Sequence, residues 1–204
     1  MSIFVVTGTD TDIGKSVFAA GLAGALGAHY WKPVQAGIDP EGDKEMVARL
    51  SGLPASHILP EAYRLTTPDS PHLAARIDGV EISLDRLALP QVAGDLVVEG
   101  AGGVLVPVSE TLLMADLFAH WRAPVILCAR TALGTINHSL LSIEALRSRG
   151  VAVGGIAFIG DPHPENERII PALAGVPRLG RLPRLDPLNA ASLRAAFAEH
   201  IRLP

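Results

Sequence analysis

The chain has 204 residues, of which 49% are hydrophobic and 19% charged, and its formal net charge is −4 at pH 7. This composition is typical of one globular domain over residues 1–204 and excludes a disordered chain or a strongly basic nucleic-acid-binding protein. It has one cysteine, no signal-peptide pattern and no apolar run near the ~20 residues that span a bilayer, so we expect a soluble, cytoplasmic protein without a membrane partner.

Short apolar runs alternate with amphipathic segments along the chain. The apolar runs predict buried strands at residues 3–7, 29–31, 95–99, 124–128 and 151–159. The amphipathic segments predict helices at residues 16–26, 43–50, 84–92, 112–121, 137–149, 165–174 and 189–201. Two proline-containing segments, 53–71 and 177–187, are expected to be loops. The alternation predicts an α/β fold: a doubly wound, mostly parallel sheet between two layers of helices.

The first predicted strand leads into Gly8-Thr9-Asp10-Thr11-Asp12-Ile13-Gly14-Lys15-Ser16, and a helix follows. Backbone N–H groups of such a loop, together with the helix N-terminus, form an anion site. In this setting Lys15 is placed to reach the β- and γ-phosphates of a nucleoside triphosphate, and the Ser16 hydroxyl to bind Mg²⁺. Five residues separate Gly8 from Gly14 where the general pattern has four, so the loop is a variant, and an ordinary turn is the competing interpretation.

Two further positions carry charge at the expected sheet edge. Lys32 follows the predicted strand 29–31, and Glu99 ends the strand 95–99 before Gly100-Ala101-Gly102-Gly103. Carboxylates at the carboxyl ends of parallel strands point into the crevice where ligands bind, and Mg²⁺ prefers oxygen ligands. The competing interpretations are a solvated lysine and a strand-end glutamate before a flexible turn.

Five segments together resemble the dethiobiotin synthetase family: the loop 8–16, Trp31-Lys32-Pro33-Val34, Glu99 to Gly103, Leu133-Gly134-Thr135-Ile136-Asn137-His138 and, more weakly, Ser70-Pro71-His72. The resemblance implies an enzyme that joins CO₂ to 7,8-diaminononanoate with ATP. A carbamate would form, the γ-phosphate would activate it, and the second amine would close a cyclic urea. Such phosphoryl transfer depends on positioning and on charge neutralisation.

The resemblance also implies roles for individual residues. Lys15 and Lys32 would be catalytic cations. The expected metal ligands are Ser16, Asp43 and Glu99. The expected substrate contacts are Thr11, Lys32, Ala36, Leu133, Gly134 and Asn137, and the last three would meet the substrate carboxylate partly across a homodimer interface. The expected nucleotide contacts are Asp12, Ile13, Gly14, Lys15, Ser16, Val17, Glu99, Gly100, Ala101, Gly102, Gly160, Asp161, Pro183, Arg184 and Leu185.

Some of these positions have a competing structural role or depart from the family. Asp43 and Asn137 would each also suit a helix N-cap. Gly160 stands where family members often carry the asparagine that reads adenine, which predicts relaxed selection of the nucleobase. Ala36 stands where others often carry serine, so Gln35 or a backbone group would have to position the substrate amine.

Three other functions share parts of this pattern. A phosphate-loop NTPase switch typically carries a second lysine early in the loop, whereas this loop has Gly8-Thr9-Asp10. An amidotransferase-type synthase needs a glutaminase domain and a cysteine nucleophile, but Cys128 lies in an apolar predicted strand. A small-metabolite kinase would share the phosphate loop but not the Glu99 glycine motif.

Overall fold

A six-stranded sheet forms the centre of the computed structural model, which describes residues 2–38 and 41–203. The strand order is β2-β5-β1-β6-β7-β8, and every neighbouring pair is parallel. Its strands are β1 (Ile3–Gly8), β2 (His29–Trp31), β5 (Leu96–Gly103), β6 (Val125–Arg130), β7 (Val153–Ile159) and β8 (Arg178–Leu182). The helices are α1 (Lys15–Leu26), α2 (Asp43–Ser51), α3 (Pro71–Ile77), α4 (Met114–Trp121), α5 (Thr135–Arg147), α6 (Pro164–Ala174) and α7 (Ala190–His200).

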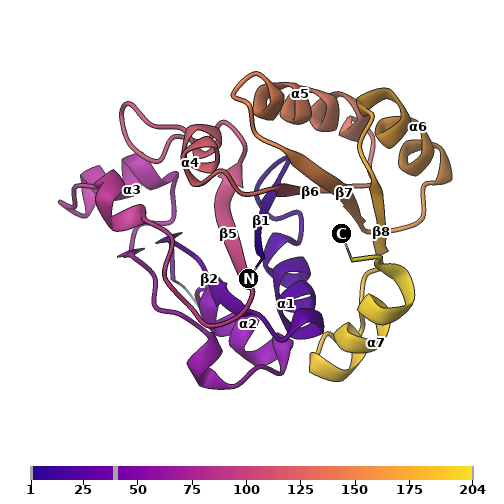
Figure 1. The fold of residues 1–204 in the computed structure, drawn as a ribbon, viewed down its shortest axis with the longest axis horizontal. Coiled ribbons are helices and arrows are strands. Elements are labelled where there is room, and N and C mark those ends of the chain that lie inside the picture. Colours follow the sequence, from indigo (N-terminus) through magenta and orange to yellow (C-terminus); the bar gives the residue numbers. More distant parts are fainter. Residues whose placement is uncertain (1, 39–40, 204) are drawn as a thin grey trace.

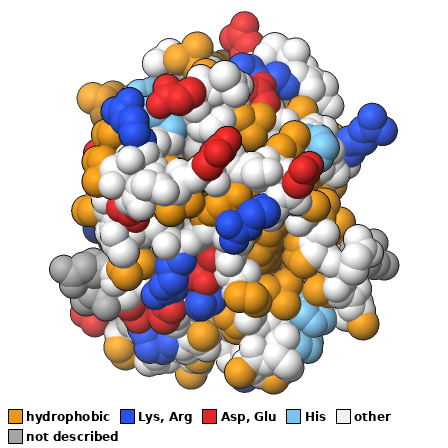
Figure 2. All heavy atoms as spheres, turned by 90° about the vertical axis from the view of Figure 1, so that its left-hand side faces the viewer, with side chains coloured by type: hydrophobic (Ala, Val, Ile, Leu, Met, Phe, Trp, Pro, Cys, Tyr) orange, Lys and Arg blue, Asp and Glu red, His pale blue; other side chains and the backbone are white. Residues whose placement is uncertain are grey.

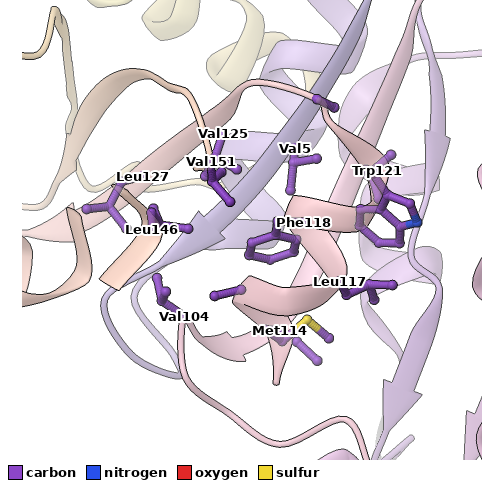
Figure 3. Packing of buried hydrophobic residues seen from close by; sticks show 14 of the residues in the cluster. Val5, Val104, Met114, Leu117, Phe118, Trp121, Val125, Leu127, Leu146 and Val151 are labelled. Atoms are coloured by element: carbon purple, nitrogen blue, oxygen red, sulfur yellow. The ribbon is translucent and has the colours of Figure 1, made fainter. Parts of the chain in front are cut away.

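Helices cover both faces of this sheet (Figure 1). Successive residues of β1 point to opposite faces, so Val5 packs into one hydrophobic core and Val6 into the other. The core around Val6 is closed by α1, α2 and α7, and the core around Val5 by α4, α5 and α6. Figure 3 shows Phe118 and Trp121 of α4 with Val5 in the core around Val5. The predicted three-layer α/β/α fold is confirmed.

The order of the strands places a crevice at the end of β1. This strand lies between β5 and β6, and the chain runs to β2 on one side before it later crosses to β6 on the other. Ligands of open α/β sheets bind at such a switch point, beyond the carboxyl ends of the strands. The loop 8–16 begins there.

One predicted helix is wrong. Residues 84–92 form only a 3₁₀ turn at Leu84–Leu87, after which Ala88 is extended. Pro90 disfavours helical geometry in the residue before it, and the Leu87 carbonyl accepts a hydrogen bond from Trp121 Nε1 at 2.8 Å instead of from a following turn.

Both predicted loops contain regular structure. Residues 177–187 include the edge strand β8. Residues 53–71 include a 3₁₀ turn (Ala55–His57) and β4 (Tyr63–Leu65), which pairs in parallel with β3 (Val34–Ala36) in a small second sheet. The side of the molecule drawn in Figure 2 mixes acidic and basic side chains with apolar ones, and Lys44 and Arg64 form ion pairs with Glu61. Within residues 2–38 and 41–203, no helix is long and apolar enough to cross a membrane.

Candidate functional site

The loop between β1 and α1 wraps around the side chain of Lys15. Lys15 is the first residue of α1, and Gly14 before it has φ of 93°, a conformation that favours glycine. A Cβ at position 14 would also lie 3.0 Å from Ile159 Cγ2, so this turn packs against the end of β7. The ammonium group of Lys15 donates to the Asp10 carbonyl oxygen at 2.6 Å and is held inside the loop.

The positive charge of Lys15 is poorly compensated in this position. It is buried, and burial followed by repulsion from Lys32 lowers the pKa of its ammonium group. An anion bound in the loop would relieve both effects. The predicted strand–loop–helix setting is therefore present, and it carries a cation that gains from contact with phosphate.

A second charged cluster lies beside the loop and joins three distant parts of the chain. Ser16 Oγ lies 2.8 Å from Asp43 Oδ1 and 2.7 Å from Glu99 Oε1. Lys32 Nζ lies 2.5 Å from Asp43 Oδ2 and 3.1 Å from Glu99 Oε1. The fold thus brings together the three predicted metal ligands and one of the two predicted catalytic lysines.

Lys32 and Asp43 stabilise each other in their charged forms. Burial opposes the charge of Lys32, but Glu99 and Asp43 together outweigh it and raise the pKa of the ammonium group. Burial likewise opposes the charge of Asp43, but Lys32 lowers the pKa of that carboxyl. The cluster therefore holds the Lys32 ammonium group and the Asp43 carboxylate as a charged pair.

The helix-cap alternative for Asp43 is wrong in this fold. Gly42 is the N-cap of α2, and Asp43 is its first helical residue. The Asp43 carboxylate points to Ser16 and Lys32, while its backbone N–H donates to Gln35 Oε1 at 3.0 Å. Gln35 Nε2 donates to the Gly37 carbonyl at 2.7 Å, so both ends of the Gln35 amide hold local backbone.

Tyr30 is a member of this cluster that sequence reasoning missed. Its hydroxyl donates to Glu99 Oε2 at 2.8 Å, and both residues are fully buried. Burial, followed by the charge of Glu99, raises the pKa of the phenol well above its ordinary value, so it stays protonated. A tyrosine inside an apolar strand indicates only a core residue, and the pairing of β2 with β5 is what brings it near Glu99.

A cavity of about 750 Å³ opens over the loop and the cluster. It is lined by residues of the loop and the cluster, by apolar and polar neighbours of both, and by the segment that follows β4: Thr11, Asp12, Gly14, Lys15, Ser16, Val17, Lys32, Gln35, Ala36, Asp43, Met46, Pro68, Asp69, Ser70, Pro71, Glu99, Ala101, Gly102 and Val106. The weakly matching segment at Ser70 and Pro71 thus lines the same space as the phosphate loop. Ala36 lies on the cavity wall, with no side-chain polar group to offer.

Not every predicted nucleotide contact faces this cavity. Glu99 does line the cavity, although it lies within β5 and does not end the strand as predicted, because β5 continues to Gly103. A Cβ on Gly100 would lie 2.8 Å from Phe118 Cζ, so Gly100 makes room for the core and not for a ligand. The Ile13 side chain is buried in the core around Val6.

The predicted nucleobase contacts lie in two segments next to the phosphate loop. Gly160 and Asp161 follow β7, and residues 183–185 follow β8. The Gly160 N–H donates to the Leu182 carbonyl at 3.1 Å, which ties the two segments together. They do not line the 750 Å³ cavity, although Ile159 contacts Gly14 at the base of the loop.

The predicted substrate contacts at Leu133, Gly134 and Asn137 lie apart from the cavity within one chain. Leu133 is fully exposed, and Gly134 is the N-cap of α5, so the N-cap role considered for Asn137 is wrong. The helix begins at Thr135, two residues earlier than predicted. Leu133, Gly134 and Asn137 therefore do not meet Lys32 in the single chain. Cys128 is fully buried in the core around Val6, as predicted.

The donor set at Ser16, Asp43 and Glu99 fits a hard divalent cation. A carboxylate oxygen of Asp43 and one of Glu99 both lie within 2.8 Å of the Ser16 hydroxyl oxygen. Mg²⁺ is typically held by one or two carboxylates together with water and substrate phosphates. In the described part of the chain no three His, Cys, Asp or Glu side chains form a metal-binding group, so the arrangement differs from a closed protein cage.

Comparison with known proteins places the chain in a family. A family model described as an AAA domain matches residues 2–192. A protein from Rhodopseudomonas palustris (strain HaA2), named ATP-dependent dethiobiotin synthetase BioD, is 66% identical over 96% of this chain and 92% of its own length. A protein of the same name from Agrobacterium fabrum is 60% identical over 98% of this chain and 94% of its own length.

Solved structures show the same fold at low identity. A ParA family ATPase from Chlorobium tepidum has a TM-score of 0.57 at 17% identity, over 97% of this chain and 92% of that one. The MinC:MinD complex of Aquifex aeolicus has a TM-score of 0.56 at 12% identity, over 96% of this chain and 86% of that one. These likenesses concern the fold alone, whereas the high-identity relatives confirm the family indicated by the motifs. The chain belongs to the ATP-dependent dethiobiotin synthetase family.

Proposed function

We propose that this chain is an ATP-dependent dethiobiotin synthetase that carboxylates and cyclises 7,8-diaminononanoate in biotin biosynthesis. The observation that carries the proposal is the convergence of Lys15 and Lys32, two buried cations from different segments, on the same cavity of about 750 Å³. The relatives at 60–66% identity bear the name of this activity over nearly their whole length.

The chemistry has three steps in which atoms and charge balance. One substrate amine attacks CO₂ and loses a proton, which leaves a carbamate. A carbamate oxygen attacks the γ-phosphorus of ATP, and ADP leaves. The second amine attacks the carbonyl carbon of this mixed anhydride, expels phosphate and loses a proton as the urea ring closes.

The chain's own residues contribute mainly electrostatics to the middle step. The reacting oxygen and the γ-phosphate are both anionic, so their approach needs fixed positive charge. Lys15 would neutralise the transferring group from the loop, and Lys32 would do so from the carbamate side. Because Lys32 is already held by Asp43 and Glu99, little reorganisation is needed when the charge develops.

Magnesium belongs to this proposal as a partner of the nucleotide. Ser16, Asp43 and Glu99 would hold the ion, which would neutralise β- and γ-phosphate oxygens when bound. The nucleobase would lie against Gly160, Asp161 and residues 183–185, beside the loop. ATP is the expected co-substrate, and the site of action would be the cytoplasm, where ATP is abundant.

A homodimer completes the proposed substrate site. The loop at Leu133 and Gly134 lies outside the cavity of its own chain, and Leu133 and Leu141 are exposed apolar side chains there. A second copy would cover them and bring the N-terminus of α5, with Asn137, to the substrate carboxylate. Sedimentation velocity tests this: Leu133→Asp should shift the dimer toward monomer.

One assay tests the function as a whole. The protein is mixed with diaminononanoate, bicarbonate, Mg²⁺ and ATP, and the cyclic urea is measured by mass spectrometry beside ADP. One ADP per dethiobiotin is expected, and none of either without bicarbonate. ADP formation that ignores bicarbonate, with a phosphorylated metabolite, would instead identify a kinase.

A further inference from the structure

The buried carboxylate of Glu99 uses its two oxygens in different ways. Oε1 lies 2.7 Å from Ser16 Oγ and 3.1 Å from Lys32 Nζ, on the side of the cavity. Oε2 accepts the Tyr30 hydroxyl at 2.8 Å. The last torsion of a glutamate side chain has a broad, roughly two-fold preference, so rotamer energy alone does not select one carboxylate plane. Ser16 and Lys32 hold Oε1, and the Tyr30 hydroxyl adds a contact to Oε2 from the other side.

The position of Tyr30 follows from the sheet. It lies in β2, two residues before Lys32, and pairs with Val97, two residues before Glu99. Adjacent parallel strands thus deliver Tyr30 and Glu99 to the same place beneath the cavity. Tyr30 does not line the cavity itself and cannot contact a ligand there.

We propose that Tyr30 is a positioning residue that fixes the Glu99 carboxylate so that Oε1 faces the divalent cation and the phosphates. The inference rests on the magnesium site of the proposed function. Partners that orient a metal ligand from behind typically change metal affinity or activity by about 10–100-fold when they are removed. A purely structural tyrosine would change stability and leave the magnesium dependence alone.

The chain offers a matched control in its other tyrosine. Tyr63 is also buried, and its hydroxyl accepts a hydrogen bond from the Ser83 N–H at 2.8 Å. It lies in β4 of the small sheet and does not contact the charged cluster. Tyr30→Phe and Tyr63→Phe each remove one buried, hydrogen-bonded hydroxyl and keep the ring.

The test is calorimetric binding of ADP at increasing Mg²⁺ concentration, repeated in EDTA. For Tyr30→Phe we expect the Mg²⁺ concentration at half-saturation to rise about tenfold or more, with ADP binding in EDTA unchanged. Tyr63→Phe should match the wild type in both. Binding in EDTA also reports that the phosphate loop is folded. An equal Mg²⁺ requirement in the two variants would overturn the inference.

A second variant isolates the donor from the ring. Replacement of Tyr30 by p-aminophenylalanine keeps an N–H donor at the same place and should restore most of the Mg²⁺ affinity. If the p-aminophenylalanine variant has no higher Mg²⁺ affinity than Tyr30→Phe, the hydrogen bond does not set the Mg²⁺ affinity and the inference is wrong. These readouts are separate from turnover: a wild type that binds Mg²⁺–ADP but forms no dethiobiotin would refute the proposed activity and leave the role of Tyr30 intact.

Discussion

Replacement of Lys32 by methionine removes the charge from the centre of the cluster and keeps most of the side-chain volume. Lys32 is 4% exposed and lies 2.5 Å from Asp43 and 3.1 Å from Glu99. At an effective dielectric constant of about 20, each pair attracts by roughly 5–7 kcal/mol before desolvation is subtracted. Loss of one partner of a buried ion pair costs about 3–5 kcal/mol of stability in practice.

Two measurements follow from this change. The free energy of unfolding should fall by about 3–5 kcal/mol without Mg²⁺. It should recover in part when Mg²⁺ is added, because a divalent cation can neutralise the two carboxylates that remain. In turnover, kcat should fall by about 10²–10³-fold, as when one transition-state donor is removed. ADP binding in EDTA should change little, because Lys15 and the loop are untouched.

Lys44→Met is the matched control for this variant. Lys44 follows Asp43 directly in the chain, but its ammonium group pairs with Glu61 at 2.7 Å, outside the cavity. Its kcat should equal that of the wild type. If Lys32→Met retains kcat within about threefold of the wild type, Lys32 does not stabilise the transferring phosphate and the reasoning from charge is wrong.

Three further predictions concern the base, the pH dependence and the C-terminal edge. Because Gly160 offers no side chain to a base edge, turnover with CTP, GTP and UTP should lie near that with ATP, and a strong, exclusive preference for ATP would contradict this. Partial burial opposes the charge of Asp116, but the hydrogen bond from Arg149 at 2.7 Å lowers the pKa of that carboxyl. Asp116→Asn should therefore lower Tm at pH 7, and the difference from wild type should close as the pH falls below about 4; a constant difference would exclude the ion pair as its source. Gly180→Ala should unfold at a clearly lower denaturant concentration, because Gly180 has φ of 128° and the new Cβ would lie 2.0 Å from the His200 carbonyl oxygen. An unchanged unfolding midpoint would show that the C-terminal segment can move away from the new Cβ without loss of stability.

The sequence predicted those parts of the fold that have long, regular apolar patterns. The strands at β1, β5, β6 and β7 are continuous apolar runs, and all four lie in the sheet. The strand β8 was missed because Pro177 and Pro183 flank its five residues, and prolines usually indicate loops. The helix α3 was missed because it is seven residues long and begins at Pro71, which suits a first helical turn.

The site was partly predictable for a different reason. Ser16, Lys32 and Glu99 each stand in a recognisable motif, and the parallel strands bring them to one edge. Tyr30 carries no such signal, since its role exists only through the register of β2 against β5. The position of Leu133 outside the cavity depends on tertiary structure, and its contact with the substrate stays a prediction.

The burial of Cys128 has a practical consequence for experiments on this protein. The only thiol of the chain is fully buried, and burial raises its pKa, so very little reactive thiolate forms at neutral pH. The unmodified chain should therefore remain unlabelled by maleimide reagents while it is folded. A cysteine introduced on the surface would give a dye a single point of attachment, which suits a fluorescence test of the proposed homodimer.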